Sequence, residues 1–466
     1  MIRFGTGGWR AIIGDEFIKA NIVQLAQAIA DDMNENKYDK IVIGYDRRFL
    51  SDTAAIWASE VFAGNGIKVY FIDFYAPTPM IMYGVKTLGA KYGMAVTASH
   101  NPASYNGIKV FTEGGRDASV EFTKTFEARI EKGVLVKSMN FAEAKEKGLI
   151  IPYNLSNEYI DSILQMVDTE AIKKSHMKVL LDPMFGVSKT SLQTILMTAR
   201  CDVDTIHDRH DTLFGGRLPS PNAKTLTRLR DMVLEGGYDI GIATDGDADR
   251  IGIIDDKGNF IHPNQILSIL YYYLVKYKGW EGDVVRNIAT THLLDRIADS
   301  FGRTCHEVPV GFKHISAKME ESDALIGGES SGGLTIRGHI RGKDGIFASA
   351  LLVELICKTG KKLSEVLDEI YALYGKREMH ETDFSFSAKK KEELQKKLFE
   401  EKALPELGVP VAKVSYMDGL KIYFENDGWI IARFSGTEPL IRIFCEMETE
   451  EKAAEICDKM RVFLGL

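Results

Sequence analysis

The sequence contains little cysteine and none of the cysteine spacings typical of a disulfide framework or a zinc site. Its 466 residues include five cysteines, all far apart and with no CxxC pair: Cys201, Cys305, Cys357, Cys445 and Cys457. An odd, dispersed set of thiols excludes a disulfide-stapled secreted scaffold and indicates a reducing compartment. We therefore expect a cytoplasmic protein without structural zinc.

Long apolar runs and clusters of basic residues are also missing. The longest apolar run, ILSILYYYLV at 266–275, is about half of a membrane span, and the N-terminal segment has no apolar signal region. Lysine and arginine are scattered and the formal net charge is -8, which argues against nucleic acid as a partner. We expect neither membrane nor nucleic acid to be bound, so a small anionic substrate needs a local basic pocket.

What the chain does contain is a regular alternation of short apolar runs and longer amphipathic segments. This alternation is typical of strands and helices that build a sheet covered on both faces. A chain of this length should divide into three or four domains. The segments that predict strands are 40–46, 67–73, 92–99, 178–183 and 238–247, and those that predict helices include 21–36 and 53–66.

The alternation changes at three places, which we interpret as domain boundaries. Residues 131–159 interrupt it, a turn and a new helix start follow 256, and a lysine-rich helix stands among strands after 374. The sequence therefore predicts an α/β protein with α/β domains at 1–155, 156–256 and 257–373 and a smaller α+β domain at 374–466.

Reactive side chains gather at the end of the predicted strand 92–99. The stretch TASHNP at 97–102 lies where α/β proteins place reacting groups, so Ser99 is a candidate for chemistry. The alternative is an ordinary loop serine next to a turn-capping His100. Because side chains adjacent in sequence diverge, we expect Ser99 and His100 not to form a nucleophile–base pair.

The segment DGDADR provides the strongest single signal. In an extended backbone Asp245, Asp247 and Asp249 would share one face. Each pair at about 4 Å would repel by roughly 4 kcal/mol at an effective dielectric constant near 20, so the cluster favours a cation, and Mg²⁺ suits such hard ligands. An EF-hand is excluded because Arg250 and Asp256 stand where that loop needs glycine and glutamate. A solvated acidic turn is the remaining alternative.

Two more loops follow short runs of mostly apolar residues, DALI at 323–326 and WIIA at 429–432. GGESSGG at 327–333 offers a carboxylate and hydroxyls suited to sugar hydroxyls, or is simply a flexible turn. RFSGTEP at 433–439, with Arg442 close behind, offers an arginine, two hydroxyls and loop N–H groups that would cradle an anion, or is an ordinary hairpin turn.

With these loops in this order, the sequence resembles the α-D-phosphohexomutase family, the phosphoglucomutases and phosphomannomutases, from FGTGGWR at 4–10 to RFSGTEP at 433–439. The resemblance implies three related α/β domains with mixed sheets and a smaller C-terminal domain around a central cleft. It also implies interconversion of hexose 1-phosphate and hexose 6-phosphate through a phosphoserine, with Mg²⁺ and a hexose 1,6-bisphosphate that is both primer and intermediate.

The resemblance also assigns roles residue by residue. Ser99 would carry the phosphoryl group and bind Mg²⁺ together with Asp245, Asp247 and Asp249. The other residues of the transfer centre would be Arg10, His100, Lys109 and Arg250. Lys109 would be a general acid or base, and a base role requires its pKa to fall from about 10.4. The substrate would be bound by Lys313, Glu329, Ser331, Lys343, Arg433, Ser435, Gly436, Thr437 and Arg442.

The sequence departs from the family pattern in two motifs. FGTGGWRA replaces the usual FGTSGIRG while keeping Arg10, and GGESSGG lacks the histidine of the bacterial phosphomannomutase/phosphoglucomutase loop. The segments VGFKHI (310–315) and HIRGKDG (339–345) are similar to those of animal and plant phosphoglucomutases and favour glucose phosphate. The alternatives are a phosphomannomutase, a phosphopentomutase, a metal-dependent sugar phosphatase and a non-catalytic phosphosugar sensor. We expect a monomer or homodimer.

Overall fold

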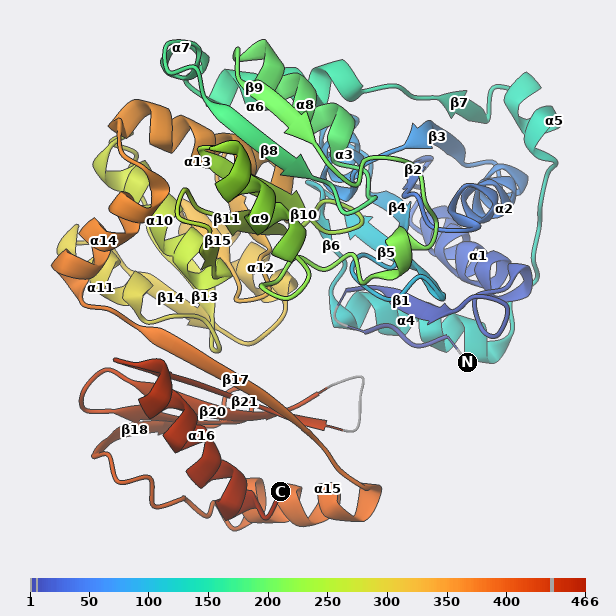
Figure 1. The fold of residues 1–466 in the computed structure, drawn as a ribbon. Helices are drawn as coiled ribbons and strands as arrows, with labels where there is room; N and C mark the ends of the chain where they lie inside the picture. Colours follow the sequence, from blue (N-terminus) through green and yellow to red (C-terminus); the bar gives the residue numbers. More distant parts are fainter. Residues whose placement is uncertain (1, 6, 436–439) are drawn as a thin grey trace.

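Four sheets organise the chain in the computed structural model, which describes residues 2–5, 7–435 and 440–466 (Figure 1). We call the units built on these sheets domains I to IV in chain order. Within these described ranges, no helix is long and apolar enough to span a bilayer.

Domain I contains a seven-stranded mixed sheet in the order β1-β5-β4-β2-β3-β7, with β6 beside β5. Strands β2, β3, β4 and β7 are parallel, whereas β1 and β5 run antiparallel to their neighbours. The elements are β1 (Trp9–Ile12), α1 (Lys19–Glu35), β2 (Lys40–Tyr45), α2 (Ser51–Gly64), β3 (Lys68–Tyr75), α3 (Thr78–Thr87), β4 (Tyr92–Val96), β5 (Tyr105–Thr112), β6 (Arg116–Asp117), α4 (Val120–Lys132), α5 (Phe141–Glu146) and β7 (Ile150–Pro152).

Both faces of the domain I sheet are buried, which explains the unbroken apolar runs of its strands. Ile41 and Ile43 of β2 pack in a core shared with α1 and α2, while Val42 between them belongs to a second core with α3. The second core continues into domains II and III, so these three domains share one apolar interior.

Domain II carries a five-stranded sheet in the order β12-β11-β10-β8-β9, and domain III a four-stranded sheet in the order β14-β13-β15-β16. The elements of domain II are α6 (Ser156–Met166), α7 (Thr169–Lys173), β8 (Lys178–Asp182), α8 (Lys189–Thr198), β9 (Asp202–Thr205), η1 (Phe214–Gly216), α9 (Thr227–Gly236), β10 (Ile240–Thr244), β11 (Ile251–Ile254) and β12 (Phe260–Ile261). Those of domain III are α10 (Pro263–Lys276), β13 (Val284–Asn287), α11 (Leu293–Ser300), β14 (Cys305–Val308), α12 (Phe312–Ser322), β15 (Ile326–Gly328), β16 (Leu334–Ile336), α13 (Gly345–Thr359) and α14 (Leu363–Tyr374). The apolar run 266–275 lies within α10 and is almost entirely buried in the shared core.

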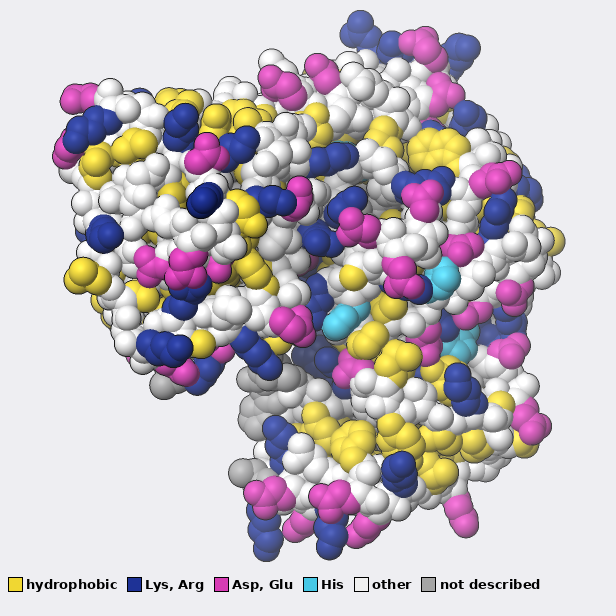
Figure 2. Space-filling model, turned by 180° about the vertical axis from the view of Figure 1, so that it is seen from behind, with side chains coloured by type: hydrophobic (Ala, Val, Ile, Leu, Met, Phe, Trp, Pro, Cys, Tyr) yellow, Lys and Arg dark blue, Asp and Glu magenta, His cyan; other side chains and the backbone are white. Residues whose placement is uncertain are grey.

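Domain IV is an antiparallel sheet, β17-β21-β20-β19-β18, packed against α16. Its elements are β17 (Glu378–Ser385), α15 (Ala388–Gln395), η2 (Lys396–Glu400), β18 (Val411–Ser415), β19 (Leu420–Phe424), β20 (Trp429–Phe434), β21 (Leu440–Met447) and α16 (Glu450–Leu464). Figure 1 shows this domain set off from the other three, and Figure 2 shows a central hollow beside it in which lysine and arginine side chains gather. The predicted fold class, three α/β units with mixed sheets and a C-terminal α+β unit, is confirmed.

Candidate active site

Loops from domains I, II and III meet around the acidic segment 245–250. Ser99, at the end of β4, donates a hydrogen bond from Oγ to Asp245 Oδ2 over 2.7 Å. Lys109 of β5 places Nζ 2.6 Å from both Asp247 Oδ2 and Asp249 Oδ2. The structure therefore brings together the serine, the three aspartates and the lysine predicted from sequence.

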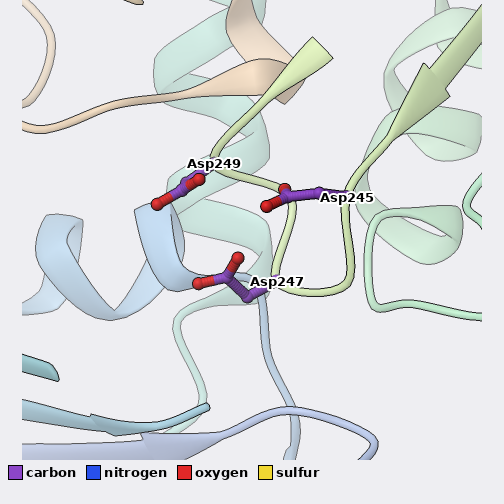
Figure 3. Close-up of side chains that lie close together, drawn as sticks. All are labelled: Asp245, Asp247 and Asp249. Atoms are coloured by element: carbon purple, nitrogen blue, oxygen red, sulfur yellow. The ribbon is translucent and has the colours of Figure 1, made fainter. Parts of the chain in front are cut away.

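The three aspartates converge because of a turn. Their side chains are fully buried, and one ligand atom of each lies within 4.8 Å of the others. Figure 3 shows the carboxylates on one loop around a common space. Ala248 has φ +64°, and the N–H of Arg250 closes the loop on Asp245 Oδ1 at 3.0 Å. The convergence is as predicted, but the extended backbone assumed for it is wrong.

Gly246 in this loop permits a close approach that a side chain would block. A Cβ at this position would lie 2.7 Å from the carbonyl oxygen of Ser99, a separation that real Cβ atoms do not tolerate against backbone. The sequence DGD therefore fits the docking of the serine loop onto the acidic loop.

The electrostatics of the acidic loop fit a divalent cation. Burial, reinforced by Asp247 and Asp249, raises the pKa of Asp245 to about 8. Burial also opposes ionisation of Asp249, but Lys109, Lys343 and Arg250 outweigh it and hold the pKa of Asp249 well below its usual range. Oδ1 of Asp247 and Oδ1 of Asp249 are buried without a hydrogen-bond partner. Unpaired buried carboxylate oxygens are the ligands that Mg²⁺ accepts, so these residues fit that ion.

The serine loop is held in an uncommon conformation. Ser99 has φ +51°, in the left-handed region that residues with a side chain seldom occupy. The guanidinium of Arg48, which follows β2, donates to four carbonyl oxygens of the loop: Ser99 and Asn101 at 2.6 Å, Pro102 at 2.8 Å and Tyr105 at 3.0 Å. Arg48 is buried and pairs with Asp46, so a buried ion pair maintains the loop.

Contrary to our expectation, the side chain of His100 does not point away from that of Ser99. His100 Nδ1 lies 3.3 Å from Ser99 Oγ. The expectation assumed ordinary backbone angles for these two residues, whereas Ser99 has a left-handed angle. The Arg250 guanidinium, then burial, then Arg10 lower the pKa of His100 far below its usual value, so the imidazole is neutral.

Lys109 lacks the lowered pKa that a base requires. Burial lowers its pKa, but Asp247 and Asp249 outweigh burial and raise it above the ordinary value. In this arrangement Lys109 is an ammonium group, suited to donating a proton or stabilising negative charge.

The two predicted arginines flank this centre. Arg10 donates from Nη1 to Asn101 Oδ1 over 2.6 Å, and burial together with Arg250 lowers the pKa of Arg10. Arg250 has Nε 3.9 Å from Asp249 Oδ1, and its backbone forms a β-bridge with Gly333. That bridge attaches the loop 327–333 to the acidic loop.

The residues predicted for the sugar occupy two different settings. Glu329 accepts hydrogen bonds from Ser331 Oγ at 2.9 Å and from Asn287 Nδ2 at 3.4 Å, on the turn between β15 and β16. Lys343, predicted as a substrate contact, is buried with Nζ 3.0 Å from Asp249 Oδ2. The structure thus gives Lys343 an aspartate partner in the acidic loop.

Arg433, the first residue of the predicted anion loop, is linked through Asp418 to a segment of domain III. Arg433 donates from Nε to Asp418 Oδ2 over 2.9 Å, and the same oxygen accepts the N–H of Val310. Lys313 lies three residues further on, and burial lowers its pKa although Glu121 favours its charge.

Two of the remaining predicted residues, Ser435 and Arg442, lie at the paired strands β20 and β21 of domain IV. Arg442 of β21 is the cross-strand partner of Arg433, and Ser435 donates its N–H to the carbonyl oxygen of Leu440 at 2.9 Å. Gly436 and Thr437 lie outside the described residues.

Sequence reasoning missed two polar residues that contact this centre, Arg48 and Thr78. Thr78 begins α3 and donates from Oγ1 to Asp247 Oδ2 over 2.6 Å. A signal was present: the two residues follow the parallel strands β2 and β3, whose carboxyl ends lie at the same sheet edge as that of β4.

Comparison with known proteins adds to this geometry. The sequence matches the phosphoglucomutase/phosphomannomutase alpha/beta/alpha domains I, II and III at residues 1–136, 157–258 and 262–374, and the family's C-terminal domain at 387–462. A phosphoglucomutase/phosphomannomutase of Thermococcus kodakarensis is 32% identical over 97% of this chain and 96% of its own. A phosphoglucosamine/phosphogalactosamine mutase of Sulfurisphaera tokodaii is 30% identical over 98% of both.

A crystal structure assigned to a phosphomannomutase from Thermus thermophilus has 30% identity and a TM-score of 0.87, covering 100% of this chain and 99% of that one. The four-domain fold and these relatives define an enzyme of the mutase class, an isomerase. The chain belongs to the phosphoglucomutase/phosphomannomutase family, which confirms the resemblance seen in the sequence.

Proposed function

We propose that the protein interconverts a hexose 1-phosphate and a hexose 6-phosphate through a phosphorylated Ser99 and a hexose 1,6-bisphosphate. The observation that carries this proposal is the placement of Ser99 Oγ 2.7 Å from a buried carboxylate in a loop with unpaired oxygens. Mg²⁺ held by Asp245, Asp247, Asp249 and the phosphoserine would neutralise charge that develops on the transferred group.

The transfer needs a proton exchange at two oxygens. A sugar hydroxyl attacks the phosphorus and gives up its proton, the bond from phosphorus to Ser99 Oγ breaks, and Oγ takes up one proton, so the proton that leaves the sugar oxygen balances the one that reaches Oγ. Asp245 Oδ2 at 2.7 Å and neutral His100 Nδ1 at 3.3 Å lie within reach of Oγ. Lys109 and Arg250, both cationic, would stabilise charge on the phosphoryl oxygens.

The second phosphate of the bisphosphate needs its own binding place. We assign it to Arg433, Ser435, Arg442 and the segment that contains Gly436 and Thr437, with Lys313 nearby; Glu329 and Ser331 would hold sugar hydroxyls. A sugar phosphatase has no need for such a second cradle, and this favours the mutase over the hydrolase.

Within the mutases we propose a preference for glucose phosphate, because of the segments around Lys313 and Lys343. Phosphomannomutase and phosphopentomutase are the competing assignments. Because two relatives are named as mutases of phosphoglucosamine, glucosamine phosphate is a further substrate to test. We further propose a cytoplasmic monomer or homodimer, for which size-exclusion chromatography with light scattering measures the oligomeric state.

The test combines a substrate panel with one substitution. Coupled assays with glucose 1-phosphate, glucosamine 1-phosphate, mannose 1-phosphate and ribose 1-phosphate, each primed with its bisphosphate, rank the substrates. Ser99→Ala should abolish turnover and phosphoprotein formation while the fold is kept, and Ser104→Ala, an exposed serine of the same loop, should retain both. Free phosphate released in step with product would favour the phosphatase instead.

A further inference from the structure

Thr78 of domain I forms two hydrogen bonds to one aspartate of the domain II acidic loop. Its hydroxyl donates to Asp247 Oδ2 over 2.6 Å, and its backbone N–H donates to the Asp247 carbonyl oxygen over 2.9 Å. Thr78 is 1% exposed and Asp247 is fully buried. Side chain and backbone of this aspartate are therefore both fixed from another domain.

An ordinary structural explanation for Thr78 is a helix cap, and the contacts argue against it. Thr78 is the first residue of α3, the N-cap position is Pro77, and no side chain caps this helix. The hydroxyl of Thr78 thus serves Asp247 across the domain boundary. In Figure 3 one end of a pale-blue helix of domain I lies beside the aspartates.

The contacts divide the two oxygens of the Asp247 carboxylate. Oδ2 accepts from Thr78 and from Lys109 Nζ, also at 2.6 Å, while Oδ1 has no partner. A carboxylate held through one oxygen presents the other in a fixed direction. Hydrogen bonds of this kind orient metal ligands, and their removal typically weakens metal binding about 10- to 100-fold.

We propose that Thr78 is a positioning residue that orients Asp247 for the divalent cation, so that domain I completes the metal site carried by domain II. This inference rests on the proposed metal site. It goes beyond that site in assigning cation affinity to a residue that does not itself touch the ion.

The test compares Thr78→Val, which keeps the shape and loses the hydroxyl, with Thr78→Ser, which keeps the hydroxyl. Mn²⁺ binding to the full-length protein is followed by electron paramagnetic resonance. Thr78→Val should raise the Mn²⁺ dissociation constant about 10- to 100-fold, and Thr78→Ser should restore it to near the wild-type value. The Mg²⁺ concentration for half-maximal turnover should rise in parallel, while KM for the sugar phosphate at saturating Mg²⁺ stays unchanged.

Failures of the two proposals are distinguishable. No Mn²⁺ binding to the wild type would overturn the metal site itself, whereas wild-type affinity in a folded Thr78→Val variant would overturn the role of Thr78. In an Asp247→Asn background, Thr78→Val should cause no further loss, and an additional loss as large as in the wild type would contradict action through Asp247. If Thr78→Val does not fold, the smaller Thr78→Ala replaces it with the same expected loss.

Discussion

Replacing Arg48 should loosen the serine loop at 97–105 while leaving the domain II segment 207–211 in place. The Arg48 guanidinium donates to four carbonyl oxygens between residues 99 and 105 at 2.6 to 3.0 Å. Methionine at this position fills similar volume but offers no donor, so all four hydrogen bonds are lost and Asp46 loses its ion-pair partner.

The expected size of this effect follows from burial and charge. A hydrogen bond to a charged group contributes about 1.5–3 kcal/mol, and removing one member of a buried ion pair costs about 3–5 kcal/mol. Because the four bonds share one guanidinium their contributions do not add, and we take about 3–5 kcal/mol as the expected loss for Arg48→Met. At about 1.4 kcal/mol per factor of ten, local opening becomes about 10²- to 10⁴-fold more frequent.

Hydrogen–deuterium exchange reads this out residue by residue. Within the loop, the amides of Asn101 and Tyr105 are bonded to carbonyl oxygens at 3.0 Å and should lose protection. Turnover should also fall, since displacement of a reacting group by about 1 Å can cost 10²-fold.

Arg47→Met is the matched control. Arg47 donates to the carbonyl oxygens of Asp208 and Arg209, at 2.9 and 3.4 Å. It should therefore loosen the segment 207–211 and leave 97–105 protected. Unchanged exchange across 97–105 in a folded Arg48→Met protein would refute the reasoning, as would equal loosening of both segments by both substitutions.

Three further predictions concern charge. Lys109→Met removes the ammonium between two buried carboxylates, so added Mg²⁺ should raise the melting temperature more in this variant than in the wild type by calorimetry. Because the pKa of Asp245 is raised to about 8, binding of Mg²⁺ at pH 7 should release about one proton in weakly buffered solution, and Asp245→Asn should release none. Burial and the nearby Arg286 lower the pKa of Lys421 from 10.5 to about 7. Between these two pH values the unfolded chain binds more protons than the folded protein, so the stability of the fold rises with pH. Lys421→Met should lack this rise when melting temperatures are compared at pH 7 and near pH 10, and an equal rise in both proteins would contradict the prediction.

The sequence predicted the strands of domains I and II well because those strands are buried on both faces. The runs at 40–46 and 178–183 became β2 (Lys40–Tyr45) and β8 (Lys178–Asp182), each within a few residues of the prediction. A parallel strand between two helical layers needs apolar residues on both sides, so an unbroken apolar run marks it clearly.

Site residues that lie together in one loop were predicted from the sequence. A contact between residues that are far apart in the sequence was missed. Asp245, Asp247 and Asp249 lie within one five-residue stretch, so their clustering is a local property. Thr78 and Asp247 are 169 residues apart, and the sequence around either residue does not indicate that they are in contact.

The orientation of His100 could not be predicted for a different reason. It accompanies a left-handed backbone angle at Ser99, which a non-glycine residue adopts only when surrounding contacts enforce it. Here those contacts include Arg48, in another loop of domain I, and Asp245 of domain II. The sequence shows which residues are present, whereas the strain appears only once the fold brings the enforcing group into place.

The charge balance of the acidic loop explains why three domains must meet at one place. If all three aspartates were ionised, carboxylates within 4.8 Å of one another would repel by roughly 3.5 kcal/mol per pair at an effective dielectric constant near 20. The lysines in contact with them come from elsewhere: Lys109 from domain I and Lys343 from domain III. Domain II therefore carries a loop whose charge is compensated by its neighbours, and the Thr78 contact lies in that same interface. Docking of the domains therefore prepares the loop for a cation, because separating domain I removes the lysine partner of Asp247 and separating domain III removes one of the two lysine partners of Asp249.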